Sequence, residues 1–296
     1  MTDQGGGRLD PTSRRQLRAS LNAHGFRPRR ALGQTFLTDA NIVRKILATA
    51  EIGGEDSVLE IGPGAGALTH ALAEAARRVV AIEIDATLVA MLQETLGERV
   101  EVIRADVLQV DWPSLLGSEG AGKWKVVANL PYAITGPALL KLLDAHDWIE
   151  RLTIMVQSEV AERLVAAPGS RARGILSVLL QAMGEVSLRL RVPRTCFWPT
   201  PRVDSAVVSL TLQRPPLLPP ALAGAFRRVV RGAFGTRRKM LVNSLAQSPE
   251  LALGKEEAQR LLLACEIAPQ RRAESLEVEE FLSLARAYAA RAEAAR

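Results

Sequence analysis

The sequence predicts an α/β fold in which helices cover both faces of a parallel sheet, followed by a smaller part made of helices. Between residues 57 and 165, short apolar stretches typical of strands alternate with stretches of helical periodicity. Such alternation is typical of a parallel sheet with crossover helices. From Ala221 onward the periodicity is helical throughout, after a proline-rich stretch at 213–220 that is typical of a stiff linker.

These two patterns divide the chain into three expected parts. Residues 1–30 form a basic, mobile N-terminal arm with a short helix from Ser13 to His24. Residues 31–213 form the sheet domain, and residues 214–296 form the helical C-terminal domain. The length of 296 residues is consistent with one large domain and one small one.

The sheet domain begins with an expected amphipathic helix at 39–52, for which Asp39 is the expected N-cap. The expected strands then lie at 57–61, 78–84, 100–104, 125–128 and 152–157. The expected helices between and after them lie at 67–76, 86–96, 137–143, 159–165 and 173–183. Two alternating stretches, 186–192 and 203–212, are expected to be strands that could pair at the edge of the sheet.

Composition excludes several classes of protein. Hydrophobic residues make up 48% and charged residues 24%, as in ordinary soluble globular proteins. There is no run of 18 apolar residues and no apolar segment near the N-terminus, so neither a transmembrane helix nor a secretory signal is expected. Two distant cysteines and three histidines without ligand spacing argue against a disulfide framework and a metal site. We expect a cytoplasmic protein, monomeric and free of metal.

The net charge of +6 is concentrated in two basic stretches. Residues 1–30 hold seven arginines and two aspartates, and residues 205–249 hold seven arginines and lysines with no acidic residue. Clusters of arginine are typical of a partner rich in phosphate, although a single cluster can also be a solvated helix face. Two such stretches favour nucleic acid as the partner.

Four residues follow or end consecutive expected strands, at intervals of 21, 23 and 23 positions: Gly62, Glu83, Asp106 and Asn129. The carboxyl ends of parallel strands share one edge of a sheet, where ligands bind. Gly62 opens a glycine-rich turn at the start of a helix, and a carboxylate such as Glu83 can accept both hydroxyls of a ribose. The Asp106 carboxylate could accept a hydrogen bond from an adenine amino group, or it could only cap a turn. Two acids disfavour a dinucleotide and favour a nucleoside with a positive centre, namely S-adenosylmethionine.

The turn at 129–132, Asn-Leu-Pro-Tyr, predicts chemistry on an exocyclic amine. The amide oxygen of Asn129 and the carbonyl oxygen of Leu130 could both accept hydrogen bonds from an NH₂ group and hold its nitrogen toward a methyl donor. Pro131 would stiffen the turn and Tyr132 would stack on the base. A second segment, 197–205, is expected to be a rigid, exposed loop in which Phe197 stacks on the other face of the base. Packing in the core is the alternative for Phe197 and for Trp198.

Together these motifs resemble the bacterial ribosomal RNA adenine dimethyltransferase family of the KsgA type, over residues 30–285. The matching stretches are 32–37, 60–66, 82–85, 105–106, 129–132, 157–163, 197–205, 233–239 and 243–245. The resemblance implies a Rossmann-like S-adenosylmethionine-dependent methyltransferase sheet with a small all-helical C-terminal domain. It also implies dimethylation of two adjacent adenines near the 3′ end of 16S rRNA, with the assembling small ribosomal subunit as the substrate.

Residue roles carried over by position complete the expectation. The cofactor contacts would be Thr35, Leu37, Gly62, Glu83, Asp106 and Asn129. The residues at the target base would be Asn129, Leu130, Tyr132 and Phe197. The residues that grip rRNA would be Arg237, Arg238 and Lys239. The family usually has Asn at the position of Thr35, so this chain offers a hydroxyl there, and it often has Tyr at the position of Arg173.

Two other functions remain open at this point. A 23S rRNA adenine-N6 methyltransferase would share the turn at 129–132, but the block at 233–239 favours a small-subunit enzyme. A non-catalytic factor of small-subunit assembly would keep the fold and the basic stretches, but the intact turn argues against a loss of catalysis.

Overall fold

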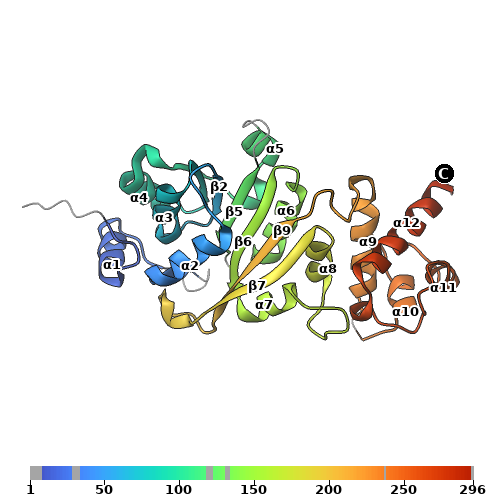
Figure 1. Cartoon of the computed structure of the whole chain (residues 1–296). Helices are drawn as coiled ribbons and strands as arrows, with labels where there is room; N and C mark the ends of the chain where they lie inside the picture. The colour runs from blue at the N-terminus through green and yellow to red at the C-terminus, as the bar shows by residue number, and fades with distance from the viewer. Residues whose placement is uncertain (1–8, 29–33, 118–122, 131–133, 237, 295–296) are drawn as a thin grey trace, which may run out of the picture. The chain divides into compact units, whose positions relative to one another are not determined.

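The computed structural model describes residues 9–28, 34–117, 123–130, 134–236 and 238–294 (Figure 1). The chain forms two compact units, each assembled from two segments. One comprises Met1–Ala161 with Ser187–Thr211, and the other comprises Glu162–Val186 with Leu212–Arg296. The segment Glu162–Val186, which we expected in the sheet domain, therefore groups with the C-terminal helices.

The first unit is built on a seven-stranded sheet with the order β4-β3-β2-β5-β6-β9-β7. The strands are β2 (Ser57–Ile61), β3 (Arg78–Glu83), β4 (Glu101–Arg104), β5 (Trp124–Asn129), β6 (Ile149–Gln157), β7 (Gly184–Val192) and β9 (Ser205–Leu212). The five strands from β4 to β6 are parallel, and β9 is antiparallel to β6. The expected α/β sheet is confirmed, with β7 at its edge beside β9 as predicted.

Burial explains why the central strands are so apolar. All five residues of β2 are buried, because β3 and β5 flank this strand and helices cover the sheet. At the edge, β7 alternates between buried or partly buried and exposed positions over much of its length. A central parallel strand needs apolar side chains on both faces, whereas an edge strand can face solvent.

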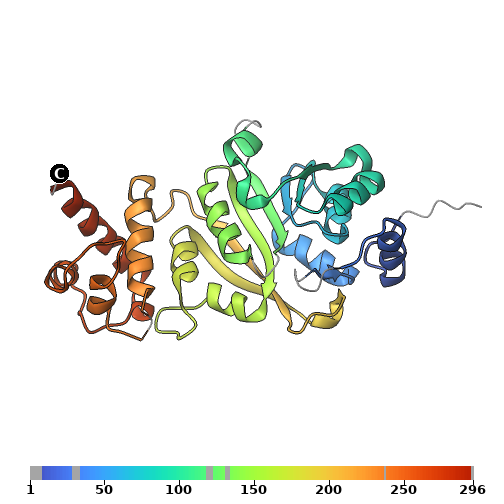
Figure 2. The same ribbon diagram turned by 180° about the vertical axis from the view of Figure 1, so that it is seen from behind.

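Helices α2 (Ala40–Ala50), α3 (Ala67–Ala75) and α4 (Ala86–Leu96) contribute to one core cluster on one face of the sheet. The Asp39 carboxylate caps α2 by accepting from the backbone N–H groups of Asn41 and Ile42 at 2.9 and 3.0 Å, which confirms the predicted N-cap. Asp85 caps α4 in the same way. Helix α6 (Thr135–Asp144) lies on the other face, as the view from behind shows (Figure 2).

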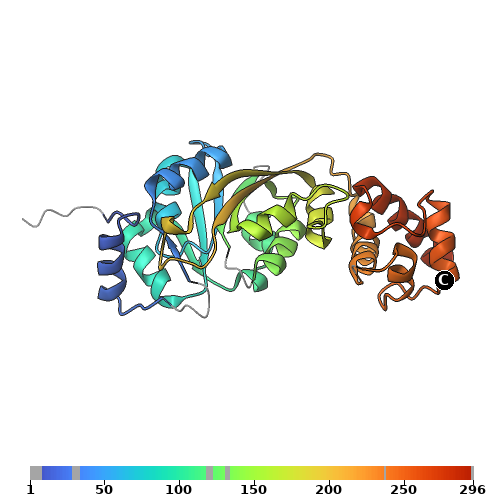
Figure 3. The same cartoon turned by 90° about the horizontal axis from the view of Figure 1, so that it is seen from below.

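Helix α1 (Arg14–Ala23) confirms the predicted N-terminal helix, and among the described residues 9–28 this helix is packed on the fold rather than mobile. Leu17 and Leu21 are each 1% exposed and pack in a cluster that contains Phe36 and Met91. Helix α1 thus lies against α4 within the first unit (Figure 3). Because the two leucines are four residues apart, they lie on one face of the helix, and that face is buried rather than solvated.

A second, two-stranded sheet joins segments that lie far apart in the sequence. Strand β1 (Phe36–Leu37) pairs antiparallel with β8 (Phe197–Trp198), with Phe36 opposite Trp198 and Leu37 opposite Phe197. We call this pair the β1–β8 ribbon. The remaining α-helices of the sheet region are α5 (Trp112–Leu116) and α7 (Ser158–Leu164).

The second unit is helical, as predicted. Its helices are α8 (Ile175–Gln181), α9 (Ala223–Phe234), α10 (Leu241–Ala246), α11 (Lys255–Ala264) and α12 (Val278–Ala294). Phe234 of α9 stacks on Phe281 of α12 with ring centroids 6.0 Å apart. Short 3₁₀ helices in the two units lie at Gly97–Arg99, Val107–Gln109, Arg194–Cys196, Pro220–Leu222 and Ala273–Ser275. None of the helices within the described ranges is both long and apolar enough to span a bilayer.

Arg173 is fully buried in the second unit, at 0% exposure. Its Nη1 donates to the carbonyl oxygen of Ala166 at 2.9 Å and to Oε1 of Gln181 at 2.7 Å. Burial lowers the pKa of this guanidinium, while the charge of Glu277 acts in the opposite direction. The buried Arg173 side chain therefore connects, through hydrogen bonds, the segment before α8 with the last residue of that helix.

Candidate active site at the carboxyl ends of the parallel strands

The four residues predicted from strand spacing all lie at the same edge of the sheet. Gly62 directly follows β2, Glu83 ends β3, Asp106 lies two residues beyond β4, and Asn129 ends β5. Because these strands are parallel neighbours in the order β4-β3-β2-β5, the edge carries Asp106, Glu83, Gly62 and Asn129 in that order. The structure thus brings together one glycine turn, two carboxylates and one amide.

The glycine turn between β2 and α3 needs glycine because of its backbone and its close contacts. Gly62, Gly64 and Gly66 have φ angles of 69°, 57° and 87°, which side-chain-bearing residues adopt at a cost. A Cβ on Gly64 would lie 3.1 Å from Cδ1 of Phe36, and a Cβ on Gly66 would lie 2.8 Å from Cδ2 of Leu92. Glycine at these positions therefore lets the turn pack closely against Phe36 and Leu92 at the start of α3.

We expect Gly66→Ala to lower the free energy of unfolding by about 2 kcal/mol, because the left-handed backbone and the contact with Leu92 both penalise a methyl group. Chemical denaturation measures this loss, and the affinity for S-adenosylmethionine should weaken with it. Gly54→Ala is the matched control, since its Cβ would have no neighbour within 4 Å and its φ is not in the left-handed region. Equal losses in the two variants would contradict the prediction.

Glu83 fastens the end of β3 to the glycine turn. Its side chain is 7% exposed in this fold. Oε1 accepts from the N–H groups of Ile84 and Asp85 at 2.9 and 3.0 Å, and Oε2 accepts from Gly64 N–H at 3.1 Å. Burial raises the pKa of this carboxyl despite the three backbone donors that oppose the shift. Carboxylate oxygens have about four acceptor positions in all, so capacity for a ligand hydroxyl remains.

Asp106 has the capping role that the sequence left open as an alternative. Its Oδ1 accepts from the N–H of Leu108 at 2.9 Å and caps the 3₁₀ helix Val107–Gln109. A cap uses one of the two carboxylate oxygens, so contact with an adenine amino group stays a prediction for this residue.

Asn129 is partly buried at the end of β5, and its amide makes no side-chain hydrogen bond to the described part of the chain. The next residue, Leu130, is 1% exposed, and its N–H donates to the carbonyl oxygen of Met155 at 3.1 Å. The sheet therefore fixes the start of the turn while the Asn129 amide keeps its hydrogen-bonding capacity. Pro131 and Tyr132 lie outside the described residues.

The β1–β8 ribbon corrects one expectation about the site. We expected Phe197 in an exposed loop, but its side chain is 1% exposed and packs in the core cluster beside Leu37. Pairing with β1 buries the ring, which sequence spacing does not reveal. A base could reach this ring only if the surrounding structure moved, so the stacking role of Phe197 stays a prediction. Leu37 is 3% exposed and Thr35 is partly buried.

The predicted rRNA contacts follow α9 in the second unit. Arg238 and Lys239 are exposed, and Lys239 Nζ donates to Oε1 of Gln247 at 2.8 Å. Arg237 lies outside the described residues. On α9 itself, Arg228 and Arg231 are exposed, while the apolar residues of the helix are buried. Helix α9 is therefore amphipathic, with arginines on its exposed face.

Sequence reasoning missed two residues at this edge. Glu60 of β2 is 1% exposed, its Oε2 has no hydrogen-bond partner in the described structure, and burial together with the charge of Glu83 raises its pKa to about 8. Ile84, between Glu83 and Asp85, is an apolar side chain with 64% exposure. The signals were an acidic residue inside an apolar strand and an apolar residue just beyond a strand end.

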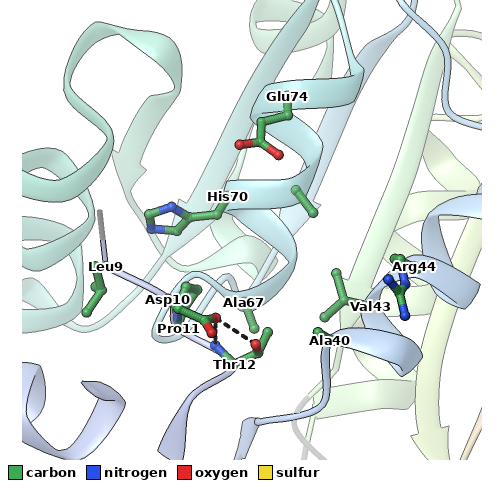
Figure 4. Close-up of a pocket in the computed structure, with 11 residues that line it drawn as sticks. Leu9, Asp10, Pro11, Thr12, Ala40, Val43, Arg44, Ala67, His70 and Glu74 are labelled. Carbon is green, nitrogen blue, oxygen red and sulfur yellow. Dashed lines mark hydrogen bonds between the residues drawn. The ribbon is translucent and has the colours of Figure 1, made fainter. Parts of the chain in front are cut away.

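A pocket of about 330 Å³ lies elsewhere in the first unit (Figure 4). The N-terminal segment at 9–12 and helices α2 and α3 line it, with Arg44, His70 and Glu74 among the polar side chains. Neither the glycine Gly62 nor the strand-end polar residues are part of its lining. Within the described ranges, no group of three or more His, Cys, Asp or Glu side chains is placed to hold a metal ion.

Comparison with known proteins gives consistent matches over most of the chain. The sequence model of the family described as ribosomal RNA adenine dimethylase matches residues 25–290. A ribosomal RNA small subunit methyltransferase A from Pelotomaculum thermopropionicum is 46% identical over 91% of this chain and 94% of its own length. The protein of the same name from Geobacter metallireducens is 42% identical, with 90% and 98% covered.

Two solved structures are similar to the chain as a whole. A dimethyladenosine transferase from Plasmodium falciparum has a TM-score of 0.69 and 25% identity, covering 84% of this chain and 95% of its own. The 23S rRNA methyltransferase ErmE has a TM-score of 0.64 and 28% identity, with 86% and 99% covered.

Proposed function

The chain belongs to the ribosomal RNA adenine dimethylase family, and from this premise we propose that it dimethylates two adjacent adenines near the 3′ end of 16S rRNA, using S-adenosylmethionine. The observation that carries the proposal is the match to relatives named ribosomal RNA small subunit methyltransferase A at 42–46% identity over about nine tenths of the chain. The strand-end geometry supports it independently.

The edge of the sheet fits a nucleoside better than a dinucleotide. Two carboxylates, Glu83 and Asp106, disfavour the phosphates of a dinucleotide and suit ribose hydroxyls and an amino group. Exposed Ile84 offers an apolar surface on which a flat base could lie. We propose that Thr35, Leu37, Gly62, Glu83, Asp106 and Asn129 hold the cofactor. When bound, S-adenosylmethionine supplies an electrophilic methyl group on a positively charged sulfur.

The residues that follow β5 would orient the target amine. The amide oxygen of Asn129 and the carbonyl oxygen of Leu130 would accept hydrogen bonds from the two N–H groups of adenine N6. Holding both N–H groups turns the nitrogen lone pair out of conjugation with the ring and toward the methyl group. The contribution of the protein is therefore positioning, with no metal required and no strong base. Tyr132 and Phe197 would contact the base.

The proposed partner is 16S rRNA within the assembling small ribosomal subunit, bound by a monomer in the cytoplasm. Similarity to ErmE keeps 23S rRNA as a second candidate substrate. The stronger matches to small-subunit enzymes favour 16S rRNA. A non-catalytic assembly factor is disfavoured by the fixed, hydrogen-bonding start of the turn at Asn129.

Incubation of the purified protein with S-adenosylmethionine and undermethylated small subunits, followed by nuclease digestion and mass spectrometry, tests the function. We expect dimethyladenosine at two adjacent positions near the 3′ end of 16S rRNA. Methylation of large-subunit RNA instead would favour the ErmE-like reaction. Tight subunit binding without methylation would favour the assembly factor.

Neutralising the basic block after α9 should weaken binding to the subunit. We expect the variant R237Q/R238Q/K239Q to reduce the slope of log affinity against log salt by about 0.7–0.9 per lost phosphate contact. Titrations at several salt concentrations measure the slope. A variant that neutralises the same number of basic residues elsewhere, at Arg44, Arg99 and Arg104, is the control for net charge. An unchanged slope in the first variant would remove this block from the interface.

A further inference from the structure

We infer that Arg14 is a positioning residue for methyl transfer, because it ties helix α1 to the β1–β8 ribbon, which carries Leu37 and Phe197. The inference rests on the proposed function, since these two residues belong to the proposed cofactor and base sites. It also reassigns part of the basic N-terminal segment, which we expected to contact nucleic acid.

The Arg14 guanidinium joins both sides of the ribbon. Its Nε donates to Oγ1 of Thr38, directly after β1, at 3.2 Å. Its Nη2 donates to the carbonyl oxygens of Thr195 and, at 3.4 Å, of Phe197, on the β8 side. Thr38 itself donates to the carbonyl oxygen of Cys196 through its N–H at 2.7 Å and its hydroxyl at 3.1 Å. One cation therefore links two segments that lie 158 positions apart at Thr38 and Cys196.

Apolar packing of helix α1 holds Arg14 next to the β1–β8 ribbon. Leu17 and Leu21 of α1 are buried in a cluster with Phe36 of the ribbon, Ala65 of the glycine turn, and Leu88 and Met91 of α4. Helix α1 therefore contacts the ribbon, the glycine turn and the helix that follows Glu83, all within the first unit. These three elements carry proposed cofactor contacts or adjoin them.

The basic residues of α1 divide into two groups. Arg14 and Arg18 face the ribbon, and Arg18 lies over the ring of Trp198 with 5.7 Å between its Cζ and the ring centroid. Arg15, the next residue after Arg14, is exposed and has no hydrogen bond or ion pair to the described residues. Two of the charges counted as available for RNA are thus already engaged within the protein.

The ribbon needs such support because it is short. Two pairs of residues cannot form a stable antiparallel pair alone. Transfer of a methyl group depends on holding donor and acceptor atoms in line within narrow limits. A side chain that bonds both the hydroxyl of Thr38, next to Leu37, and the carbonyl oxygen of Phe197 should therefore influence cofactor affinity and turnover together.

The test compares Arg14→Gln with Arg14→Lys and with the matched control Arg15→Gln. Calorimetry gives the affinity for S-adenosylmethionine, and methylation of small subunits gives kcat and KM. Thermal denaturation gives Tm, and titrations in salt give the slope for subunit binding. Arg14, like Arg15, is an exposed residue, but its guanidinium makes charge-assisted hydrogen bonds to both sides of the ribbon. We expect Arg14→Gln to raise the KM for S-adenosylmethionine and to lower kcat, each by about threefold to tenfold, through the loss of these bonds.

Three further results complete the expectation. Arg14→Lys should recover part of the loss, the salt slope of Arg14→Gln should equal that of the wild type, and Tm should match that of Arg15→Gln within about 3 °C. Arg14→Gln with wild-type KM and kcat would overturn the inference, and so would a change confined to Tm. A reduced salt slope with intact cofactor affinity would make Arg14 an RNA contact. A wild-type protein that neither binds S-adenosylmethionine nor methylates subunits would instead overturn the proposed function, and the inference with it.

Discussion

Asn129→Ala should lower the rate of methyl transfer by about 10²–10³ while subunit binding stays unchanged. The amide of Asn129 has no side-chain hydrogen bond to the described residues, and β5 fixes its backbone at the carboxyl edge of the sheet. A preorganised acceptor that meets the reacting amine is worth about as much as a donor in an oxyanion hole. The measurement is single-turnover methylation of saturating small subunits, with subunit affinity determined separately.

Asn22→Ala is the matched control for this change, because Asn22 is an exposed asparagine on α1. The control should methylate at the wild-type rate. Asn129→Ala with near-wild-type turnover would show that another group holds the amine. A large fall in Tm would show instead that the residue mainly stabilises the end of β5.

Glu60→Gln should make the protein more stable than the wild type at pH 8.5, by about 2–4 kcal/mol. Burial and the charge of Glu83 raise the pKa of Glu60 to about 8, while in an unfolded chain the pKa of this group is near its ordinary value of 4.5. Between these values the folded state holds a proton that the unfolded state has lost. The free energy of unfolding therefore falls as the pH rises from 4.5 to about 8, and glutamine abolishes this contribution.

Urea denaturation of the cofactor-free protein at pH 5.5 and pH 8.5 checks the prediction. At pH 5.5 the difference in free energy of unfolding between the two proteins should be smaller than at pH 8.5, because most of the pH range between 4.5 and about 8 lies above pH 5.5. Glu55→Gln serves as the control, because Glu55 is exposed. The pKa of Glu83 is also raised, so some pH dependence should persist in Glu60→Gln. If the free energy of unfolding of Glu60→Gln changed between pH 5.5 and pH 8.5 as much as that of the wild type, the raised pKa of Glu60 would be contradicted.

Local signals in the sequence were sufficient for most elements of the fold. Helix α4 spans Ala86–Leu96 as predicted, and Asp39 caps α2, because capping and periodicity depend on neighbouring residues. The strand-end rule placed Gly62, Glu83, Asp106 and Asn129 at one edge, since parallel strands share their direction. The residue types at that edge predicted a nucleoside cofactor and chemistry on an exocyclic amine, and the family resemblance added the rRNA substrate.

Contacts between distant segments could not be predicted in the same way. Leu37 pairs with Phe197, and no local pattern indicates a pair so far apart in the sequence. The burial of Phe197 accompanies that pairing, and the docking of α1 depends on a cluster with Phe36, Leu88 and Met91, so both differed from expectation. The raised pKa of Glu60 depends equally on the strands beside it, because desolvation requires neighbours on every side.

The division of the chain into two discontinuous units has a consequence for synthesis and for dissection of the protein. The backbone passes between the units three times, at Ala161, Val186 and Thr211. During translation, α8 therefore emerges before α9, which packs against it, has been made. A fragment that stops at Gln213 would leave Val178, Leu179 and Leu180 without the C-terminal helices of their own unit. Such a fragment should therefore aggregate. No single cut in the chain separates the first unit from the second, because each unit consists of two segments.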